Sequence, residues 1–142
     1  MLEYVERTTA PGIVATSEAT AEVVMTLPAL VLDGTQDIYI EHSHPWWGMS
    51  TTTAVAFLTI FGAKDGAAAA PLQRTWDSRA WATSAQIGGF TTRTPLLTPA
   101  AGSWVYTLRA HSSASNTFTL QAGGGGAGVD MPMSMMAVEV LP

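Results

Sequence analysis

Short runs of β-branched and aromatic residues, separated by Gly, Pro, Asp and Ser, recur along this chain of 142 residues, and no segment can sustain a long helix. The clearest run is DIYIEH at residues 37–42, where Ile38 and Ile40 share one face and Tyr39 and Glu41 share the other. Such alternation is typical of a strand with one buried face. The pattern therefore predicts an all-β chain.

About eight or nine short strands are expected from this pattern. The candidate segments for these strands are residues 12–16, two short stretches around a kink at Pro28, and residues 37–42, 51–61, 72–76, 82–87, 90–93, 104–110, 118–122 and 134–141. Turns are expected at Asp33-Gly34, Lys64-Asp65-Gly66 and Gly88-Gly89, and Pro45 is expected to start another. Residues 104–110 and 118–122 are predicted to pair as a hairpin. Regular spacing of strands and turns indicates a sandwich or a barrel.

The length suits one compact domain rather than two. Residues 1–11 (MLEYVERTTAP) carry three charges, lack the apolar core of a signal peptide and support no element of their own. We therefore expect an extended N-terminal arm over residues 1–11 that docks on a neighbour, followed by a single β-sandwich domain over residues 12–142.

The composition is poor in charge: 12% of the residues are charged, 47% are hydrophobic, and the net charge is −5. Such a surface favours an oligomer or a lattice component, with a compact monomer covered by Thr, Ser and Ala as the alternative. Six scattered cations argue against nucleic-acid binding. The longest apolar run near the middle, AVAFLTIFGA, is too short to span a bilayer, so no membrane partner is expected.

The strand expected at residues 51–61 is apolar on both faces. One face carries Val55, Phe57 and Phe61, and the other carries Ala56, Leu58 and Ile60. In a two-layer sandwich one of these faces meets the core, so the other must be covered by something else. We expect a partner subunit to cover it, and the chain's own loops are the alternative.

A glycine run at residues 123–128 contains the pattern G-x-G-x-x-G, which is typical of dinucleotide-binding turns. The residues that follow, VDMPMSMMAVEVL, are rich in β-formers and contain a proline, so no helix N-terminus is available for a phosphate. Nucleotide binding is therefore not expected. Glycine's lack of a Cβ instead fits a tightly packed contact, formed by Gly123, Gly124, Gly125 and Gly126.

His42 and His44 would share one face of a strand and could bind a metal, completed by Asp37, Glu41 or His111. The favoured interpretation is two histidines at the edge of a loop, because Pro45 follows directly. No cofactor or metal is therefore expected.

The adjacent Trp46 and Trp47 could stack on a sugar or anchor an interface. Carboxylates and amides that would accompany a sugar platform are sparse, so interface or core is favoured. The methionines of the MPMSMM stretch, among them Met133 and Met135, are adaptable packing residues and are expected at an interface.

Nothing in the sequence favours catalysis. Cysteine is absent, the G-x-S-x-G pattern of a nucleophile elbow is missing, and no carboxylate pair stands in a glycosidase-like setting. We expect that the protein is not an enzyme.

The C-terminal third, LLTPAAGSWVYTLRAHSSASNTFTLQAGGGGAG, resembles the end of structural proteins of tailed phages of actinobacteria. The matching positions are Thr98, Pro99, Ala101, Gly102, Tyr106, Arg109, Ala110 and the run at residues 123–128. Upstream, the segment VMTLPALVLDGTQDIYIEHSHP is similar to the same proteins at Leu27, Pro28, Leu32, Asp33 and Gly34. The resemblance covers most of residues 23–141 and departs from the family at HSHPWW and MPMSMM.

The resemblance implies a jelly roll like those of tumour necrosis factor and the globular head of complement, which commonly form trimers. It also implies a place in the phage particle and no catalytic residues. The leading expectation is therefore a virion protein, made in the host cytoplasm, that decorates or cements the capsid as a homotrimer bound to the major capsid protein.

Two alternatives stay open. The first is a tail-associated module that attaches to host cell-wall glycan through Trp46 and Trp47. The second is a metal-dependent enzyme built on His42, His44 and His111.

Overall fold

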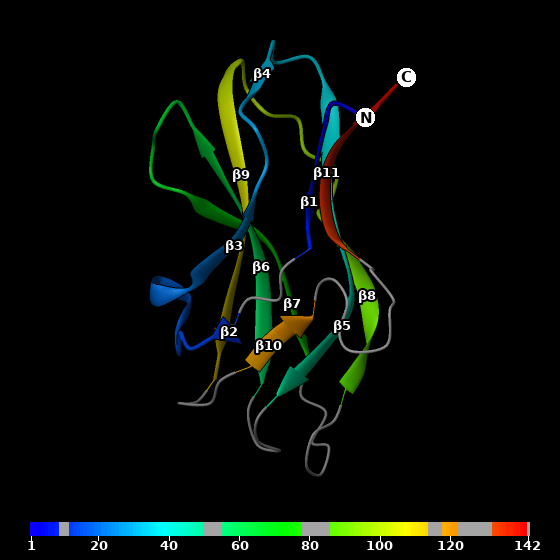
Figure 1. Cartoon of the computed structure of the whole chain (residues 1–142). Helices are drawn as coiled ribbons and strands as arrows, with labels where there is room; N and C mark the ends of the chain where they lie inside the picture. The colour runs from blue at the N-terminus through cyan, green and yellow to red at the C-terminus, as the bar shows by residue number, and fades with distance from the viewer. Residues whose placement is uncertain (9–11, 50–54, 78–85, 114–117, 122–131, 142) are drawn as a thin grey trace.

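A computed structural model of the chain describes residues 1–8, 12–49, 55–77, 86–113, 118–121 and 132–141 (Figure 1). At residues 45–49, 76–77, 86–90 and 118–121 the backbone alone is described. The described residues form eleven strands and one short 3-10 turn, η1 (Glu18–Thr20). The strands are β1 (Glu3–Arg7), β2 (Gly12–Ile13), β3 (Glu22–Thr26), β4 (Leu30–Leu32), β5 (Asp37–Met49), β6 (Ala56–Lys64), β7 (Ala70–Asp77), β8 (Gln86–Arg93), β9 (Gly102–Ser112), β10 (Phe118–Gln121) and β11 (Met133–Val140).

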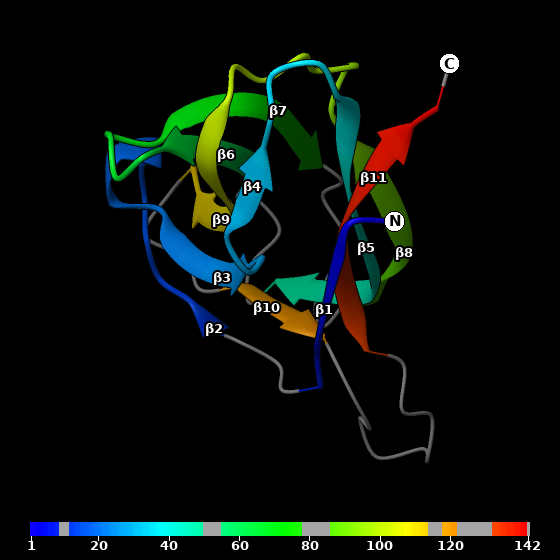
Figure 2. The same ribbon diagram turned by 90° about the horizontal axis from the view of Figure 1, so that it is seen from above.

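The strands form two antiparallel sheets that face each other, as the view from above shows (Figure 2). The first sheet has the order β1-β11-β5-β10-β2, with β8 also paired to β5, and the second has the order β3-β9-β6-β7, with β4 also paired to β9. The chain changes sheet between β2 and β3, between β4 and β5, between β5 and β6, and again at each step from β7 to β10. This order is that of a jelly roll, so the expected all-β jelly-roll sandwich is confirmed. None of the described helical segments is long and apolar enough to cross a membrane.

The described residues form more strands than the expected eight or nine, and two strand positions are each divided between two segments. The predicted kink at Pro28 is confirmed, because β3 and β4 pair with successive parts of β9 on either side of it. Between them, the backbone N–H of Leu27 donates to the carbonyl oxygen of Tyr106 at 3.0 Å. Proline, which has no N–H, therefore sits where the ladder is already interrupted.

The segments β10 and β11 are divided in the same way, since both pair with the edge of β5 opposite β8. Ser134 faces Ser43 and Gln121 faces Trp46, so β10 and β11 occupy successive parts of the same edge of β5. The glycine run at residues 123–128 lies outside the described residues, but the strands that flank it belong to one sheet.

The prediction that Pro45 starts a turn is wrong, because β5 continues through it to Met49. The backbone N–H of Ile38 and the carbonyl oxygen of Ile40 bond with residues 94 and 97, on the β8 side. By the alternation of an antiparallel ladder, the nitrogen of Pro45 faces the opposite edge, between the ends of β10 and β11. The missing donor therefore falls at a position of β5 for which the described part of the chain provides no paired strand residue on that edge.

Two further predictions about turns are wrong. Residues 104–110 and 118–122 do not form a hairpin, because β9 belongs to the second sheet and β10 to the first. Gly88-Gly89 is not a turn but lies within β8, where Gly88 pairs with Trp46. The pattern at residues 104–110 and 118–122 indicates strand character without indicating the partner strand, and the glycine pair was interpreted as a break although it lies within one strand.

The expected arm over residues 1–11 also requires correction. Residues Glu3–Arg7 form β1, which pairs along its whole length with β11 of the same chain. The side chain of Arg7 reaches the second sheet, where its Nη1 donates to the carbonyl oxygen of Val24 at 2.7 Å. The N-terminal segment is therefore an edge strand of the sandwich over the range of β1.

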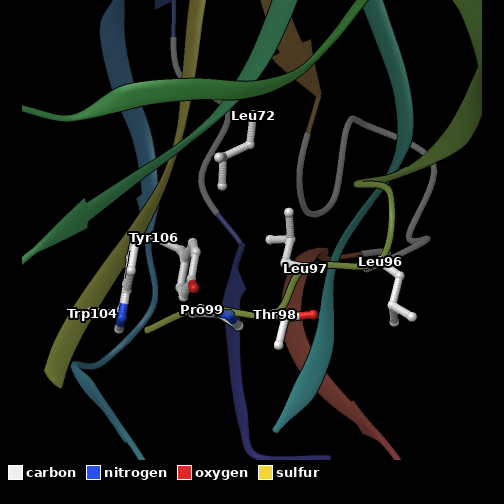
Figure 3. Close-up of a pocket in the computed structure, with 7 residues that line it drawn as sticks. All are labelled: Leu72, Leu96, Leu97, Thr98, Pro99, Trp104 and Tyr106. Atoms are coloured by element: carbon white, nitrogen blue, oxygen red, sulfur yellow. The ribbon is translucent and has the colours of Figure 1, made fainter. Parts of the chain in front are cut away.

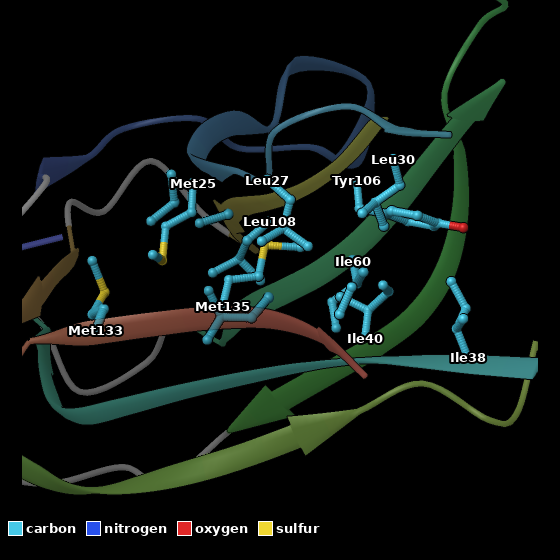
Figure 4. Close-up of a cluster of buried hydrophobic side chains, with 14 of the residues drawn as sticks. Met25, Leu27, Leu30, Ile38, Ile40, Ile60, Tyr106, Leu108, Met133 and Met135 are labelled. Carbon is cyan, nitrogen blue, oxygen red and sulfur yellow. The ribbon is translucent and has the colours of Figure 1, made fainter. Parts of the chain in front are cut away.

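The core lies between the two sheets (Figure 4). Fully buried side chains from the first sheet, among them Ile38, Ile40 and Met135, face Ile60 and Leu108 of the second. The other large members of this cluster are Ile13, Val24, Met25, Leu27, Leu30, Leu32, Leu58, Tyr106 and Met133. Burial of these side chains is the main source of stability, at about 1.5–3 kcal/mol for each large apolar side chain.

Candidate functional site

The outer surface of the first sheet carries a set of apolar side chains that we term the first-sheet face. Alternate residues of β11, β5 and β1 point away from the core, because directly paired residues project to the same side of a sheet. Tyr4 pairs with Met136 and Val138 pairs with Tyr39, so four of these side chains lie in adjacent rows. The first-sheet face consists of Tyr4, Tyr39, Met136, Val138 and Val140.

The first-sheet face is open to solvent in the single chain. Tyr4 and Val140 are each 41% exposed, and Tyr39, Met136 and Val138 are partly exposed. Figure 2 shows two layers of strands, and no further described element lies outside β1, β11 and β5. A sheet face that carries two tyrosines, a methionine and two valines without a covering layer is typical of an interaction surface.

Charged groups border the first-sheet face. The guanidinium of Arg93 lies over the ring of Tyr39, 4.7 Å from its centroid, and Glu41 is paired with Arg93 across the strands. At the other edge, the hydroxyl of Tyr4 donates to a carboxylate oxygen of Glu6, and this bond raises the pKa of Tyr4. An apolar centre with a polar rim is the usual anatomy of a protein interface.

The outer face of β6 in the second sheet is different, because the chain's own polar side chains cover its aromatic rings. Phe57 stacks on His111 at 4.7 Å between ring centroids, and the guanidinium of Arg109 lies 4.5 Å from the centroid of the Phe61 ring. Phe61 is 5% exposed, while Val55 and Phe57 are partly exposed. The apolar second face of β6 is therefore covered largely from within the chain, which was the alternative to a partner subunit.

Two of the expected interface residues belong to the core. Met133 and Met135 project inward from β11 and are fully buried between the sheets, so the prediction that they line an interface is wrong. Their neighbour Met136 is the methionine that faces outward. In a strand, successive side chains point to opposite faces, so a register error of one residue exchanges core for surface.

The remaining expected interface residues lie outside the described residues. This applies to Gly123, Gly124, Gly125 and Gly126, and to the side chains of Trp46 and Trp47. The backbone of both tryptophans runs in β5, where Trp46 pairs with Gly88 and Gln121, and Trp47 pairs with Ile87 and Leu120.

His42 and His44 share one face of β5, as predicted, but this face points into the core. The Nε2 atom of His42 lies 3.0 Å from the Nδ1 atom of His44, and the Nδ1 atom of His42 lies 3.0 Å from the carbonyl oxygen of Ser134. Burial lowers the pKa of His42 to about 4 and the pKa of His44 to about 3. Both rings are therefore neutral near pH 7.

The structure does not bring the third histidine to this pair. His111 lies on the outer face of the second sheet against Phe57, so β9 and the core separate it from His42 and His44. Burial lowers the pKa of His111 too, and the nearby charge of Arg74 acts in the same direction. Among the described residues, no three His, Asp or Glu side chains are grouped so that they could hold a metal ion.

The first-sheet face was not identified from the sequence, although part of its signal was visible. The alternation in DIYIEH places Tyr39 on the face opposite Ile38 and Ile40. The alternation in β11 was obscured because Met133, Met135 and Met136 are chemically alike. Sequence comparison adds no identification, since no family model and no curated protein matches the chain.

Proposed function

We propose that this protein is a non-enzymatic structural protein of a phage particle, and that it decorates or cements the capsid as a homotrimer. The observation that carries the proposal is the first-sheet face, a solvent-open apolar surface on a jelly roll in which the apolar outer face of β6 is covered by the chain's own side chains. The resemblance of residues 23–141 to structural proteins of tailed phages supports a place in the virion.

The energetic argument concerns the five side chains of the first-sheet face. Fully burying a large apolar side chain stabilises a complex by about 1.5–3 kcal/mol, and these side chains are already partly buried, so each contributes less. Together with the bordering Arg93 and Glu41, they can hold a specific contact between copies. When the same contact repeats around a three-fold axis, it closes into a ring of three copies, which is a trimer.

The proposal also accounts for the small share of charged residues in the chain. Only 12% of the residues are charged. A surface with few charged groups suits a protein that stays packed against copies of itself and against a capsid shell. The partner in the particle would be the major capsid protein.

The test is sedimentation velocity of the purified protein over a range of concentrations, combined with one matched pair of variants. Val138→Glu places a charge in the centre of the first-sheet face, and we expect it to convert the trimer to a monomer with an unchanged fold by circular dichroism. Val31→Glu makes the same change at a residue of β4 that is 84% exposed, and it should leave the trimer intact.

Two results would contradict the assembly. The first is a wild-type protein that sediments as a monomer at every concentration, and the second is a Val138→Glu variant that remains trimeric. Binding to capsid shells, measured beside binding to purified host cell wall, then separates decoration from host attachment. Binding to cell wall and not to capsid shells would support the alternative, a tail-associated protein that attaches to the host.

A further inference from the structure

A pocket of about 310 Å³ opens between β7, β9 and the residues that connect β8 to β9 (Figure 3). Its lining is mostly apolar, with two aromatic rings and one threonine. The residues that line it are Leu72, Leu96, Leu97, Thr98, Pro99, Trp104 and Tyr106. Its volume lies within the range of small-molecule sites, which are concave and mostly apolar, with a few fixed polar groups.

One polar group in this lining lacks a partner. Tyr106 projects inward from β9 and is fully buried, and its hydroxyl finds no hydrogen-bond partner among the described residues. Figure 4 shows the hydroxyl at the end of the core cluster, directed away from Leu108. A buried hydroxyl without a partner costs about 1–3 kcal/mol, so its presence in a pocket wall points to a ligand.

The other polar groups of the pocket are already engaged, and they hold the walls in place. The indole Nε1 of Trp104 donates to the carbonyl oxygen of Ala100 at 2.8 Å, and the hydroxyl of Thr98 donates to Asp37 at 2.6 Å. The rings of Trp104 and Tyr106 stack at 5.9 Å with 9° between their planes. The aromatic wall is therefore positioned before any ligand arrives.

The absence of a side chain at Gly62 leaves space for the aromatic wall. A Cβ atom at Gly62 of β6 would lie 3.0 Å from Leu72 Cδ1 and 3.1 Å from Tyr106 Cε1. These distances are tighter than ordinary carbon contacts, so the glycine allows both lining side chains to lie close to the backbone of β6. The pocket thus depends on residues of three strands of the second sheet.

We propose that this pocket binds a neutral aromatic small molecule of phenol or indole size. Its ring packs among Leu72, Leu97 and the aromatic wall, and its polar atom forms a hydrogen bond with the hydroxyl of Tyr106. The apolar lining does not suit a sugar, which needs several hydrogen bonds, whereas one unpartnered hydroxyl matches a ligand with one polar group. This binding site is separate from the first-sheet face and does not depend on the proposed virion function.

The test compares two probes and two proteins by NMR titration of the full chain. The probes are p-cresol and toluene, which differ by one hydroxyl, and the proteins are the wild type and Tyr106→Phe. We expect saturable binding of p-cresol to the wild type, weakened roughly five- to tenfold in the variant. Toluene should bind both proteins equally.

Tyr106→Phe removes a hydroxyl without a partner and keeps the ring, so we expect the variant to fold with unchanged or higher stability. Three results would overturn the proposal: no saturable binding of either probe, equal affinity of both probes for the wild type, or equal weakening of both probes in the variant. Dissociation of the oligomer by p-cresol would also overturn it, because the pocket would then hold a side chain of another copy.

Discussion

The Nε2 atom of His42 lies 3.0 Å from the Nδ1 atom of His44, and both rings are buried beneath the first sheet. The Nδ1 atom of His42 faces the carbonyl oxygen of Ser134, which can only accept, so this nitrogen carries the proton. The Nε2 atom of His42 is then the acceptor, and the Nδ1–H of His44 donates to it. One backbone carbonyl thus fixes the tautomers of both rings.

This pair predicts that acid destabilises the fold. Burial lowers the pKa of His42 to about 4 and that of His44 to about 3, below the ordinary value of 6.5. As the pH falls below about 6.5, the unfolded chain binds protons that the folded chain does not, so the free energy of unfolding decreases. Each histidine adds a slope approaching about 1.4 kcal/mol per pH unit, until the pH reaches its folded pKa.

Urea unfolding between pH 6.5 and pH 5 measures this slope, because carboxylates contribute little in that range and the contribution of His111, whose pKa is also lowered, is shared by the wild type and the variant. The double variant His42→Gln, His44→Gln should lose most of the slope, although it is less stable than the wild type at pH 7. A wild type whose stability is constant over this range, or a double variant with the full slope, would show that the buried pair does not control acid stability.

The two methionines at positions 135 and 136 should respond differently to truncation. Met135 is fully buried in the core, so Met135→Ala removes packed atoms and leaves a cavity, which costs about 2–5 kcal/mol of folding stability. Met136 lies on the first-sheet face, so Met136→Ala should change the stability of the monomer by less than about 1 kcal/mol and weaken assembly instead.

Unfolding and sedimentation of both variants check this pair. A larger loss of folding stability for Met136→Ala than for Met135→Ala would mean that the register of β11 against β5 is wrong by one residue, and equal losses would mean that Met136 is not on an exposed face.

Two turn glycines should differ in their tolerance of alanine. Gly34 and Gly66 both have positive φ, of 92° and 77°, so alanine is strained at each position by about 1–2 kcal/mol. A Cβ at Gly34 would also lie 3.0 Å from the backbone nitrogen of Ala101, whereas a Cβ at Gly66 would meet open space.

Thermal melts should therefore show a larger loss for Gly34→Ala than for Gly66→Ala. Equal losses would mean that the approach of Ala101 to the Asp33-Gly34 turn is not part of the fold in solution.

Local sequence patterns predicted the strands better than they predicted the pairing of those strands. The alternation around Ile38 and Ile40 identified β5, and Pro28 identified the division between β3 and β4, because both effects depend on a few adjacent residues. The partners of β9 and β10 could not be predicted, since alternation defines which face is buried and gives no information about the neighbouring strand. Pro45 was misinterpreted because its missing N–H is tolerated where the ladder beside it is interrupted.

The candidate site was harder to predict than the fold. A surface formed by Tyr4, Tyr39 and Val138 joins residues from both ends of the chain, and only the pairing of β1, β11 and β5 brings them together. The pocket beside Tyr106 has the same character, because its lining comes from β7, β9 and the connection between β8 and β9. Neither set of residues forms a motif along the sequence.

The central claim is that the first-sheet face joins copies of this protein on a phage capsid. Cryo-electron microscopy of particles that carry the protein tests it most directly. We predict density for the jelly roll on the outer capsid surface at three-fold or quasi-three-fold positions, with Tyr39 and Val138 turned toward a neighbouring copy. Density confined to the tail, or a capsid-bound protein whose first-sheet face is turned to solvent, would contradict the claim.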